Sequence, residues 1–243
     1  MVKSTALYFV RRSRRGTLIP MTATRTARER ARAELTQEIK DEARRQLADV
    51  GAHGLSLRAV ARELGMVSSA LYRYFPSRDR LLTDLIVDAY NAIGEAAEQA
   101  DPGKGAPRDR WLAIWHATRD WARAHPHEYA LIYGSPIPGY QAPQDTVAPA
   151  GRVALALVKV LTHTELRAID GEVAPELRAQ AETLTKILGI VAGPETVTRL
   201  IMAWTQLFGA INFDLFGQYV GSVDPADAFF THSATRMAEF VGI

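Results

Sequence analysis

The chain has 243 residues, of which 47% are hydrophobic and 23% charged, and this balance is typical of a globular protein with a sizeable core. It contains no cysteine, which excludes disulfides, thiolate zinc sites and cysteine nucleophiles. The longest uncharged apolar stretch in a helix-like segment, residues 200–213, is too short for a bilayer span of about 20 residues. The apolar patch near the start precedes its arginine cluster, the reverse of a signal peptide, so we expect a cytoplasmic protein.

Charge is distributed unevenly along the chain. Residues 1–80 hold 17 basic and 8 acidic residues, a net charge of +9, whereas the remaining 163 residues hold 12 basic and 19 acidic ones, a net charge of −7. A basic block on an acidic body is typical of a nucleic-acid-binding segment. An anionic membrane partner or a solvated charged face would give the same asymmetry, so the spacing of the motifs has to decide.

The first twenty residues lack sustained periodicity, and we expect a flexible basic arm over residues 1–25. Apolar residues then recur at helical spacing and predict a helix over residues 28–50 that stops at Gly51. A second helix is expected to begin after the N-cap residue Ser56 and to end at Gly65.

A third helical segment, Ser68–Phe75, is closed by Pro76, and the next helix runs from Ser77 to about Ile93. Two short helices that flank a tight, glycine-containing turn have the layout of a helix-turn-helix. This motif lies inside the basic block, which favours nucleic acid as the partner.

Residues 101–107 form the clearest linker, with two prolines and two glycines. Helical spacing beyond it predicts six further helices, four of which have proline at or near the first turn. They cover about residues 109–124, 128–133, 149–162, 175–188, 194–218 and 225–241, with a loop over 134–144. No stretch alternates as a strand would, so the predicted fold class is all-α.

Residues 55–86 read LSLRAVARELGMVSSALYRYFPSRDRLLTDLI. With its surroundings, about residues 30–90, this stretch resembles the DNA-binding domain of the TetR/AcrR transcriptional regulators. The family pattern has a small or hydroxyl residue that opens the motif, an Ala-x-x-x-Gly approach to the turn, and Leu-Tyr-x-His-Phe followed by Lys and a Leu pair. The corresponding residues here are Ser56, Ala61 to Gly65, Leu71 to Phe75, Arg78, Leu81 and Leu82.

Three positions depart from that pattern. Tyr74 replaces the usual His and Arg78 the usual Lys, and both substitutes keep a hydrogen-bond donor. Val67 stands where Ser or Thr usually caps the recognition helix, so we expect Ser68 to take the capping role one residue later.

The C-terminal part has a weaker likeness to the subfamily named for a Trp-His-Gly motif. The residues that carry it are Trp111, His116, Trp121, His125, Pro126, Tyr129, Leu131 and Gly134. In the late helix Phe208 stands where the subfamily has His. The resemblance implies a helix-turn-helix DNA-binding domain over residues 26–95 and a helical ligand-binding and dimerisation domain over residues 96–243.

A recognition helix presents its first turn to base edges in the major groove. Here that turn consists of Val67, Ser68, Ser69 and Ala70, small residues of which Val67 and Ala70 suit a thymine methyl. Arg73 is the long cation of this segment able to fork onto guanine, and Arg25 and Arg28 are alternatives that would read the minor groove.

Other residues of the motif are better placed for phosphates than for bases. We assign to phosphate contact, or to the support of it, Ser56, Arg58, Tyr72, Tyr74 and Arg78. Tyr72 also fits a core aromatic. For Leu57, Val60, Leu71 and Phe75 we favour the core over DNA contact.

Aromatic residues recur along two helices of the C-terminal part. Trp111, Trp115 and Arg119 share one helix face by their i, i+4, i+8 spacing, and Trp204, Phe208 and Asn212 repeat it. Two such faces fit either a largely apolar ligand pocket or a filled core. The resemblance implies an inducer pocket here, to which we also assign His116, Tyr129 and Tyr133.

Catalytic signatures are missing from the sequence. It has no HExxH motif, no paired carboxylates at ligand spacing, no G-x-S-x-G elbow and no phosphate-binding glycine loop after a strand. We interpret His125 and His127 as exposed imidazoles at a helix end. The sequence therefore predicts no enzyme activity, no metal site and no cofactor.

The two last helices carry more apolar side chains than one helix face can bury inside a chain of this size. The resemblance implies that they pack against a two-fold mate as a four-helix bundle, so that two recognition helices read a pseudo-palindromic operator. Ligand binding would then change the angle of the helix near Asp84 to Gly94.

The sequence therefore predicts a homodimeric, sequence-specific DNA-binding regulator, a repressor that a small molecule releases. Two alternatives stay open: a helical small-molecule carrier or enzyme that has lost operator binding, and a non-specific architectural DNA binder.

Overall fold

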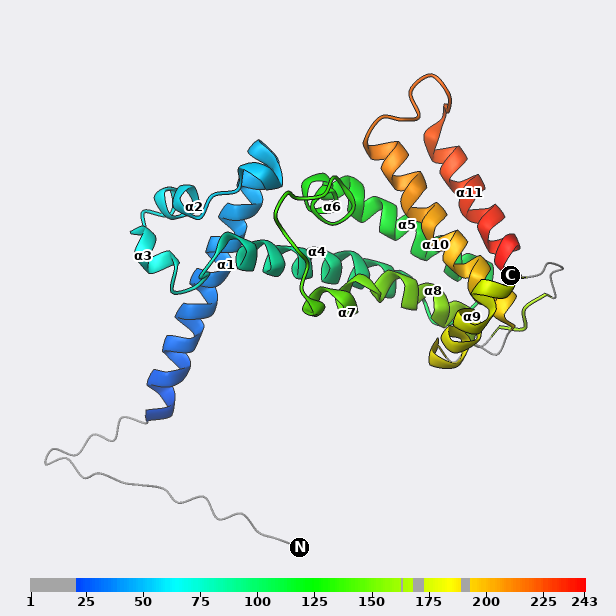
Figure 1. Ribbon diagram of the computed structural model, residues 1–243, viewed down its shortest axis with the longest axis horizontal. Coiled ribbons are helices and arrows are strands. Elements are labelled where there is room, and N and C mark those ends of the chain that lie inside the picture. Colours follow the sequence, from blue (N-terminus) through cyan, green and yellow to red (C-terminus); the bar gives the residue numbers. More distant parts are fainter. Residues whose placement is uncertain (1–20, 163, 168–172, 189–192) are drawn as a thin grey trace, which may run out of the picture.

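The computed structural model describes residues 21–162, 164–167, 173–188 and 193–243. These residues form eleven α-helices, one short 3-10 helix and no strand, which confirms the all-α prediction. The helix-turn-helix lies at one end of the elongated molecule and the last helices at the other, with α4 between them (Figure 1). Within the described residues, no helix is long and apolar enough to cross a membrane. Of the flexible arm expected over residues 1–25, residues 1–20 and the side chain of Arg25 lie outside the described residues, whereas the backbone of residues 21–25 is helical, so the arm prediction is wrong there.

The first helix, α1 (Met21–Gly54), starts earlier than the expected residue 28 and projects well beyond its neighbours (Figure 1). Its residues 26–34 are exposed, and burial begins at Ile39 because only the later turns meet other helices. The predicted end at Gly51 is visible as a break, where a φ of 68° interrupts the helix. Glycine adopts this left-handed conformation without a steric penalty.

Two short helices follow, α2 (Leu57–Glu63) and α3 (Ser68–Leu71). The Ser56 side chain caps α2 by accepting from the Ala59 N–H at 3.4 Å, as its position before the apolar stripe predicts. Two expectations for α3 are wrong. It ends at Leu71 instead of Phe75, and its N-cap residue is Val67, with no side-chain cap from Ser68.

The helix α4 (Arg78–Ala100) runs through two hydrophobic cores. Its first turns place Leu81 and Leu85 in a core shared with α1, α2 and α3, and its later turns place Ala89 and Ile93 in a second core with α5, α8, α10 and α11. The division between the cores therefore falls inside α4, before the expected domain boundary at residue 95. A rotation of α4 would move one core relative to the other.

The remaining helices build the second core. They are α5 (Pro107–Ala124), α6 (Pro126–Tyr133), α7 (Val147–Ala150), α8 (Arg152–Thr162), α9 (Pro175–Leu188), α10 (Pro194–Leu215) and α11 (Ala226–Val241), with the 3-10 helix η1 (Gln144–Thr146) before α7. The helix expected over residues 149–162 is divided at Gly151, and α10 ends three residues before the expected Gln218.

The linker between α4 and α5 is closed by a bidentate ion pair. Arg110 donates through Nε and Nη2 to the two carboxylate oxygens of Asp101 at 2.7 and 2.8 Å, and Gly103 N–H adds a third donor at 2.9 Å. The side chains of Arg110 and Asp101 are 10% and 2% exposed. These donors, the Arg110 hydrogen bond first, lower the pKa of Asp101 to about 2.

Candidate nucleic-acid interface

The surface of α3 carries the residues that the sequence assigns to base contact. Val67, Ser68, Ser69 and Arg73 are exposed, and Ala70 is half-buried. Tyr72 is 43% exposed, whereas Leu71 and Phe75 are buried, which confirms the core assignment of the last two. Leu57 and Val60 of α2 are also buried, as predicted. The first turn of α3 exposes small residues, while the buried side chains of Leu71 and Phe75 hold the segment against the core. This turn can therefore approach another surface closely.

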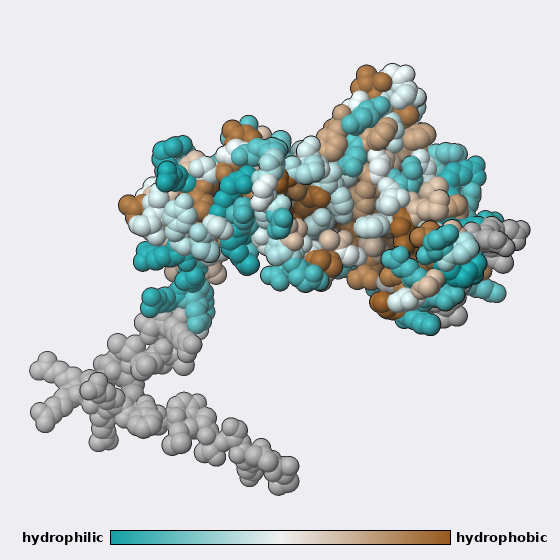
Figure 2. All heavy atoms as spheres, viewed as in Figure 1, coloured by the Kyte–Doolittle hydropathy of each residue, from teal (hydrophilic) through white to brown (hydrophobic). Residues whose placement is uncertain are grey.

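Around α3, further polar groups reach the surface. Arg58 on α2 and Arg28 on α1 are exposed, and Ser56 is half-buried while it caps α2. The projecting part of α1 is covered with hydrophilic side chains (Figure 2). These positive groups lie on helices that share one core, so they form one surface in a fixed relation to α3.

Arg32 is a residue of this surface that the sequence interpretation missed. Its guanidinium carbon lies 5.1 Å from the centre of the Tyr74 ring, and its Nη2 donates to the Arg73 carbonyl at 3.4 Å. The contact links α1 to the turn after α3 and occupies one face of Tyr74. The spacing of Arg28 and Arg32, one helical turn apart, indicates a basic stripe on one face of the helix. It does not indicate the contact between Arg32 and Tyr74.

Arg78 makes contacts that differ from those expected of a phosphate-binding residue. Its Nη2 donates to the Ala52 carbonyl at 2.6 Å, and its Nε donates to the Leu55 carbonyl at 3.1 Å. Both carbonyls lie between the break at Gly51 and the start of α2, in residues 52–56, the α1–α2 segment. The first turn of α4 therefore holds that segment in place through Arg78.

A cluster of charges joins α1 to the second core. Arg44 of α1 donates through Nη2 to Asp88 of α4 at 2.7 Å and through Nε to Glu128 of α6 at 3.0 Å. Lys40 adds an ion pair to Asp88 at 2.6 Å. Burial by itself lowers the pKa of Arg44, but attraction to Glu128 and Asp88 outweighs it and raises the pKa above its ordinary value.

The residues assigned to a ligand lie in two groups. The first is on α5 and faces α11. Trp111 and Trp115 are fully buried, and Trp111 donates through Nε1 to the Ala234 carbonyl at 3.1 Å. His116 is half-buried, with its ring centroid 5.6 Å from that of Phe230.

Arg119, the last residue of this group, is 3% exposed. It donates through Nε to Asp214 of α10 at 2.9 Å, and its guanidinium lies 4.5 Å from the centre of the Phe230 ring. Its Nη2 lies 2.9 Å from Asp227 without hydrogen-bond geometry. Arg119 is thereby engaged with the protein, and it ties α5 to α10 and α11.

The second group lies between α6 and α10. Tyr129 donates to the Oδ1 of Asn212 at 2.9 Å, and the Tyr133 ring stacks on Phe208 with centroids 4.0 Å apart. Trp204 meets Phe208 edge-on, with centroids 6.0 Å apart. Burial raises the pKa of Tyr133, so its phenol stays protonated and neutral.

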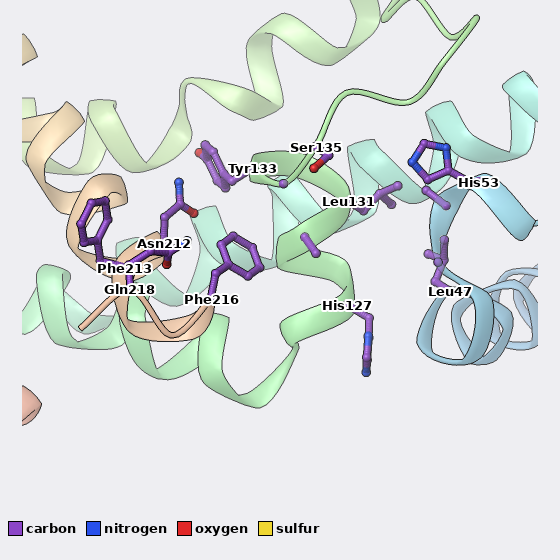
Figure 3. Close-up of a pocket in the computed structure, with 14 residues that line it drawn as sticks. Leu47, His53, His127, Leu131, Tyr133, Ser135, Asn212, Phe213, Phe216 and Gln218 are labelled. Carbon is purple, nitrogen blue, oxygen red and sulfur yellow. The ribbon is translucent and has the colours of Figure 1, made fainter. Parts of the chain in front are cut away.

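A groove of about 700 Å³ lies between the end of α1, α6 and the end of α10 (Figure 3). Of the nine residues assigned to ligand binding, Tyr133 and Asn212 line it. The α6 side chains, such as Leu131 and Tyr133, lie between those of α1 and those of α10. The sequence interpretation missed this site because its lining residues on α1 and α10, such as His53 and Asn212, are more than 150 residues apart in the chain.

Comparisons with known proteins cover both parts of the chain. Residues 39–85 match the model of bacterial regulatory proteins of the tetR family, and residues 111–237 match the tetracyclin repressor-like C-terminal domain. The HTH-type transcriptional regulator Mb1846 of Mycobacterium bovis is 41% identical over a 211-residue alignment, and the match covers 82% of this chain and 89% of that protein. The likeness to the Trp-His-Gly subfamily stays a prediction.

Two further relatives agree with this result. The regulatory protein SCO4313, known from a crystal structure, has a TM-score of 0.74 and 32% identity, and the match covers 87% of this chain and 98% of that one. The HTH-type transcriptional repressor DrrR1 of Streptomyces coeruleorubidus is 39% identical over 106 residues, 43% of this chain and 38% of that protein. The helix-turn-helix surface, the all-α body and these matches together show that the chain belongs to the TetR family of DNA-binding transcriptional regulators.

Proposed function

We propose that this regulator is a repressor that binds a pseudo-palindromic operator as a homodimer and leaves it when a small molecule binds the second core. The observation that carries the proposal is the exposed first turn of α3 beside arginines of α1 and α2. Val67, Ser68, Ser69 and Ala70 meet the base edges, and Arg73, which follows α3, supplies a guanine-specific fork.

Phosphate contacts in this proposal come from residues around α3. Arg58, Tyr72 and Tyr74 position the helix, with Ser56 at the N-terminus of α2, and Arg28 extends the contact along α1. Arg78 supports the surface from behind, because its Nε and Nη2 donate to the Leu55 and Ala52 carbonyls. Its role is therefore to position α2 and α3.

The dimer in this proposal forms through α10 and α11. Leu200, Leu207 and Ile211 of α10 are buried within the chain, but Met202 and Ile201 are 53% and 42% exposed. On α11 Phe229 is 39% exposed. Hydrophobic side chains are visible over this part of the molecule and at the tip of the α10–α11 loop (Figure 2). An isologous interface would bury them and set the spacing of the two α3 helices.

Ligand response is supported by two indole groups of the second core. The Nε1 atoms of Trp115 and Trp204 are buried and have no acceptor among the described residues. Most buried donors are paired, and an unpaired donor costs free energy that a ligand carbonyl or hydroxyl would recover. A ligand that reorders this core acts on α4, which extends from it to the DNA-binding surface.

The test is selection of bound sequences from random duplexes, followed by titration of the winner and its scramble at two salt concentrations. We expect a palindromic winner preferred by about a thousandfold or more, with a steep salt dependence. Equal binding of the scramble would indicate an architectural DNA binder. Failure to bind any duplex would favour a carrier that has lost its operator.

A further inference from the structure

We propose that the groove between α1, α6 and α10 is a binding site for an uncharged aromatic small molecule with a hydrogen-bond acceptor, separate from the core around Trp115 and Trp204. Its volume of about 700 Å³ lies within the range of ligand sites in proteins, roughly 300–1,000 Å³. An occupant would touch both the DNA-binding part and the C-terminal part of the chain.

The lining chemistry identifies the class of ligand. No Lys, Arg, Asp or Glu is among the lining residues, and the two imidazoles, His53 and His127, are exposed to water, so a charged molecule would lose hydration and gain at most a screened partner. Rings come from Tyr133, Phe213 and Phe216, of which Phe213 and Phe216 are 49% and 44% exposed. The exposed rings of Phe213 and Phe216 offer stacking surfaces for a planar molecule, whereas one face of Tyr133 is already stacked on Phe208.

Polar groups are few and are placed at both ends of the rings. The Oδ1 of Asn212 accepts from Tyr129 at 2.9 Å, which leaves the amide nitrogen of Asn212 to donate to a ligand. Ser135 and Gln218 add a hydroxyl and an amide on opposite sides of Phe216 and Tyr133 (Figure 3). A few convergent donors on apolar walls suit a carbonyl or ether oxygen on an aromatic frame.

The groove also lies where a ligand would affect the DNA-binding surface. His53 and Ala52 line it on the α1 side, and the Ala52 carbonyl is the acceptor that Arg78 holds. Leu131 of α6 lines it and packs in the first core. A ligand in the groove would hold the α1–α2 segment against α6 and so change operator affinity, a consequence that rests on the proposed function.

The absence of cysteine from the chain allows a direct test of binding at this site. Ser135→Cys places a single thiol in the groove, and Gln141→Cys places one on the same loop outside it, where the residue is also exposed. The full-length protein is treated with N-ethylmaleimide with and without Nile red, an uncharged aromatic probe, and no DNA is present. At a probe concentration of ten times its Kd, labelling of the Ser135→Cys thiol should slow about tenfold.

The control thiol of Gln141→Cys should react at an unchanged rate. Three results would overturn the proposal: no Nile red fluorescence increase, an increase without protection of the Ser135→Cys thiol, or a Ser135→Cys thiol that does not react even without probe because the groove is covered. Because operator binding is measured separately on the wild-type protein, failure of the site and failure of the proposed function give different results.

Discussion

Arg44 and Glu128 meet at 3.0 Å across the boundary between the two hydrophobic cores, with side chains that are 24% and 20% exposed. The pair joins α1 to α6, and Leu131 of the same α6 packs in the first core while Tyr129 packs in the second. The helix α6 therefore holds the DNA-binding part to the ligand-binding part by a polar and an apolar contact. Both contacts would have to adjust if the two cores moved relative to each other.

A double-mutant cycle should detect this link. Arg44→Ala and Glu128→Ala, singly and together, should give a coupling free energy of about 0.5–1.5 kcal/mol in urea unfolding, more than an exposed pair because the groups are largely buried. The exposed pair Arg62 and Glu63 is the control and should give less. A coupling energy near zero for Arg44 and Glu128 would show that α6 is held by its apolar contacts alone.

Arg78→Ala should destabilise the protein. The substitution removes the charged donors of the Ala52 and Leu55 carbonyls, and such hydrogen bonds contribute about 1.5–3 kcal/mol each. Urea unfolding should show the loss, and hydrogen exchange should show that it begins in the α1–α2 segment. Unchanged stability together with a weaker salt dependence of DNA binding would instead restore a phosphate role for Arg78.

Arg58→Ala should change DNA binding and leave stability unchanged, the reverse of what we expect for Arg78→Ala. Arg58 is exposed, so unfolding stability should stay unchanged while the log–log salt slope of DNA binding falls by roughly one for each subunit. Arg178→Ala, which removes an exposed arginine of α9, away from the proposed dimer interface, is the matched control and should leave the slope as it is. A loss confined to one base pair of the operator would identify Arg58 as a base-reading residue.

Met202→Glu should dissociate the dimer. A carboxylate at this exposed position of α10 would be buried against the partner at a cost of several kcal/mol, so sedimentation at micromolar concentration should show monomers. Ile187→Glu changes an apolar residue of α9 that is more exposed than Met202, and it should leave the dimer intact. If both variants stay dimeric, the interface lies elsewhere.

Stability should fall at acid pH in part through Asp101. Its pKa is about 2 in the folded protein, below the ordinary value of 3.8, so its stabilising contribution is fully present well above the ordinary value and is lost as the pH falls through 3.8 towards 2. The shift corresponds to a contribution on the order of 2 kcal/mol. Urea unfolding at pH 7, 4 and 2.5 should show a smaller pH dependence for Asp101→Asn than for the wild type. Equal pH dependence of the variant and the wild type would show that Asp101 does not contribute to the loss of stability at acid pH.

The sequence by itself determined the elements whose formation depends on near neighbours. Spacing and capping chemistry over a few residues predict the cap at Ser56 and the turn at Gly65. They also predict that Leu71 and Phe75 are buried. The all-α class follows from helical periodicity over the described chain. The family resemblance rested on the same short motif, and the matches over residues 39–85 confirm it.

Only the tertiary structure decided which side chains are buried or bound by residues far away in the sequence. Arg78 is a cation within a basic motif, yet it donates to carbonyls more than 20 residues earlier in the chain. Trp111 and Tyr133 are both aromatic residues of predicted helices, but Trp111 is fully buried and Tyr133 lines the groove. Periodicity fixes the face of a helix on which a residue lies, whereas the neighbour that covers that face depends on how the helices pack.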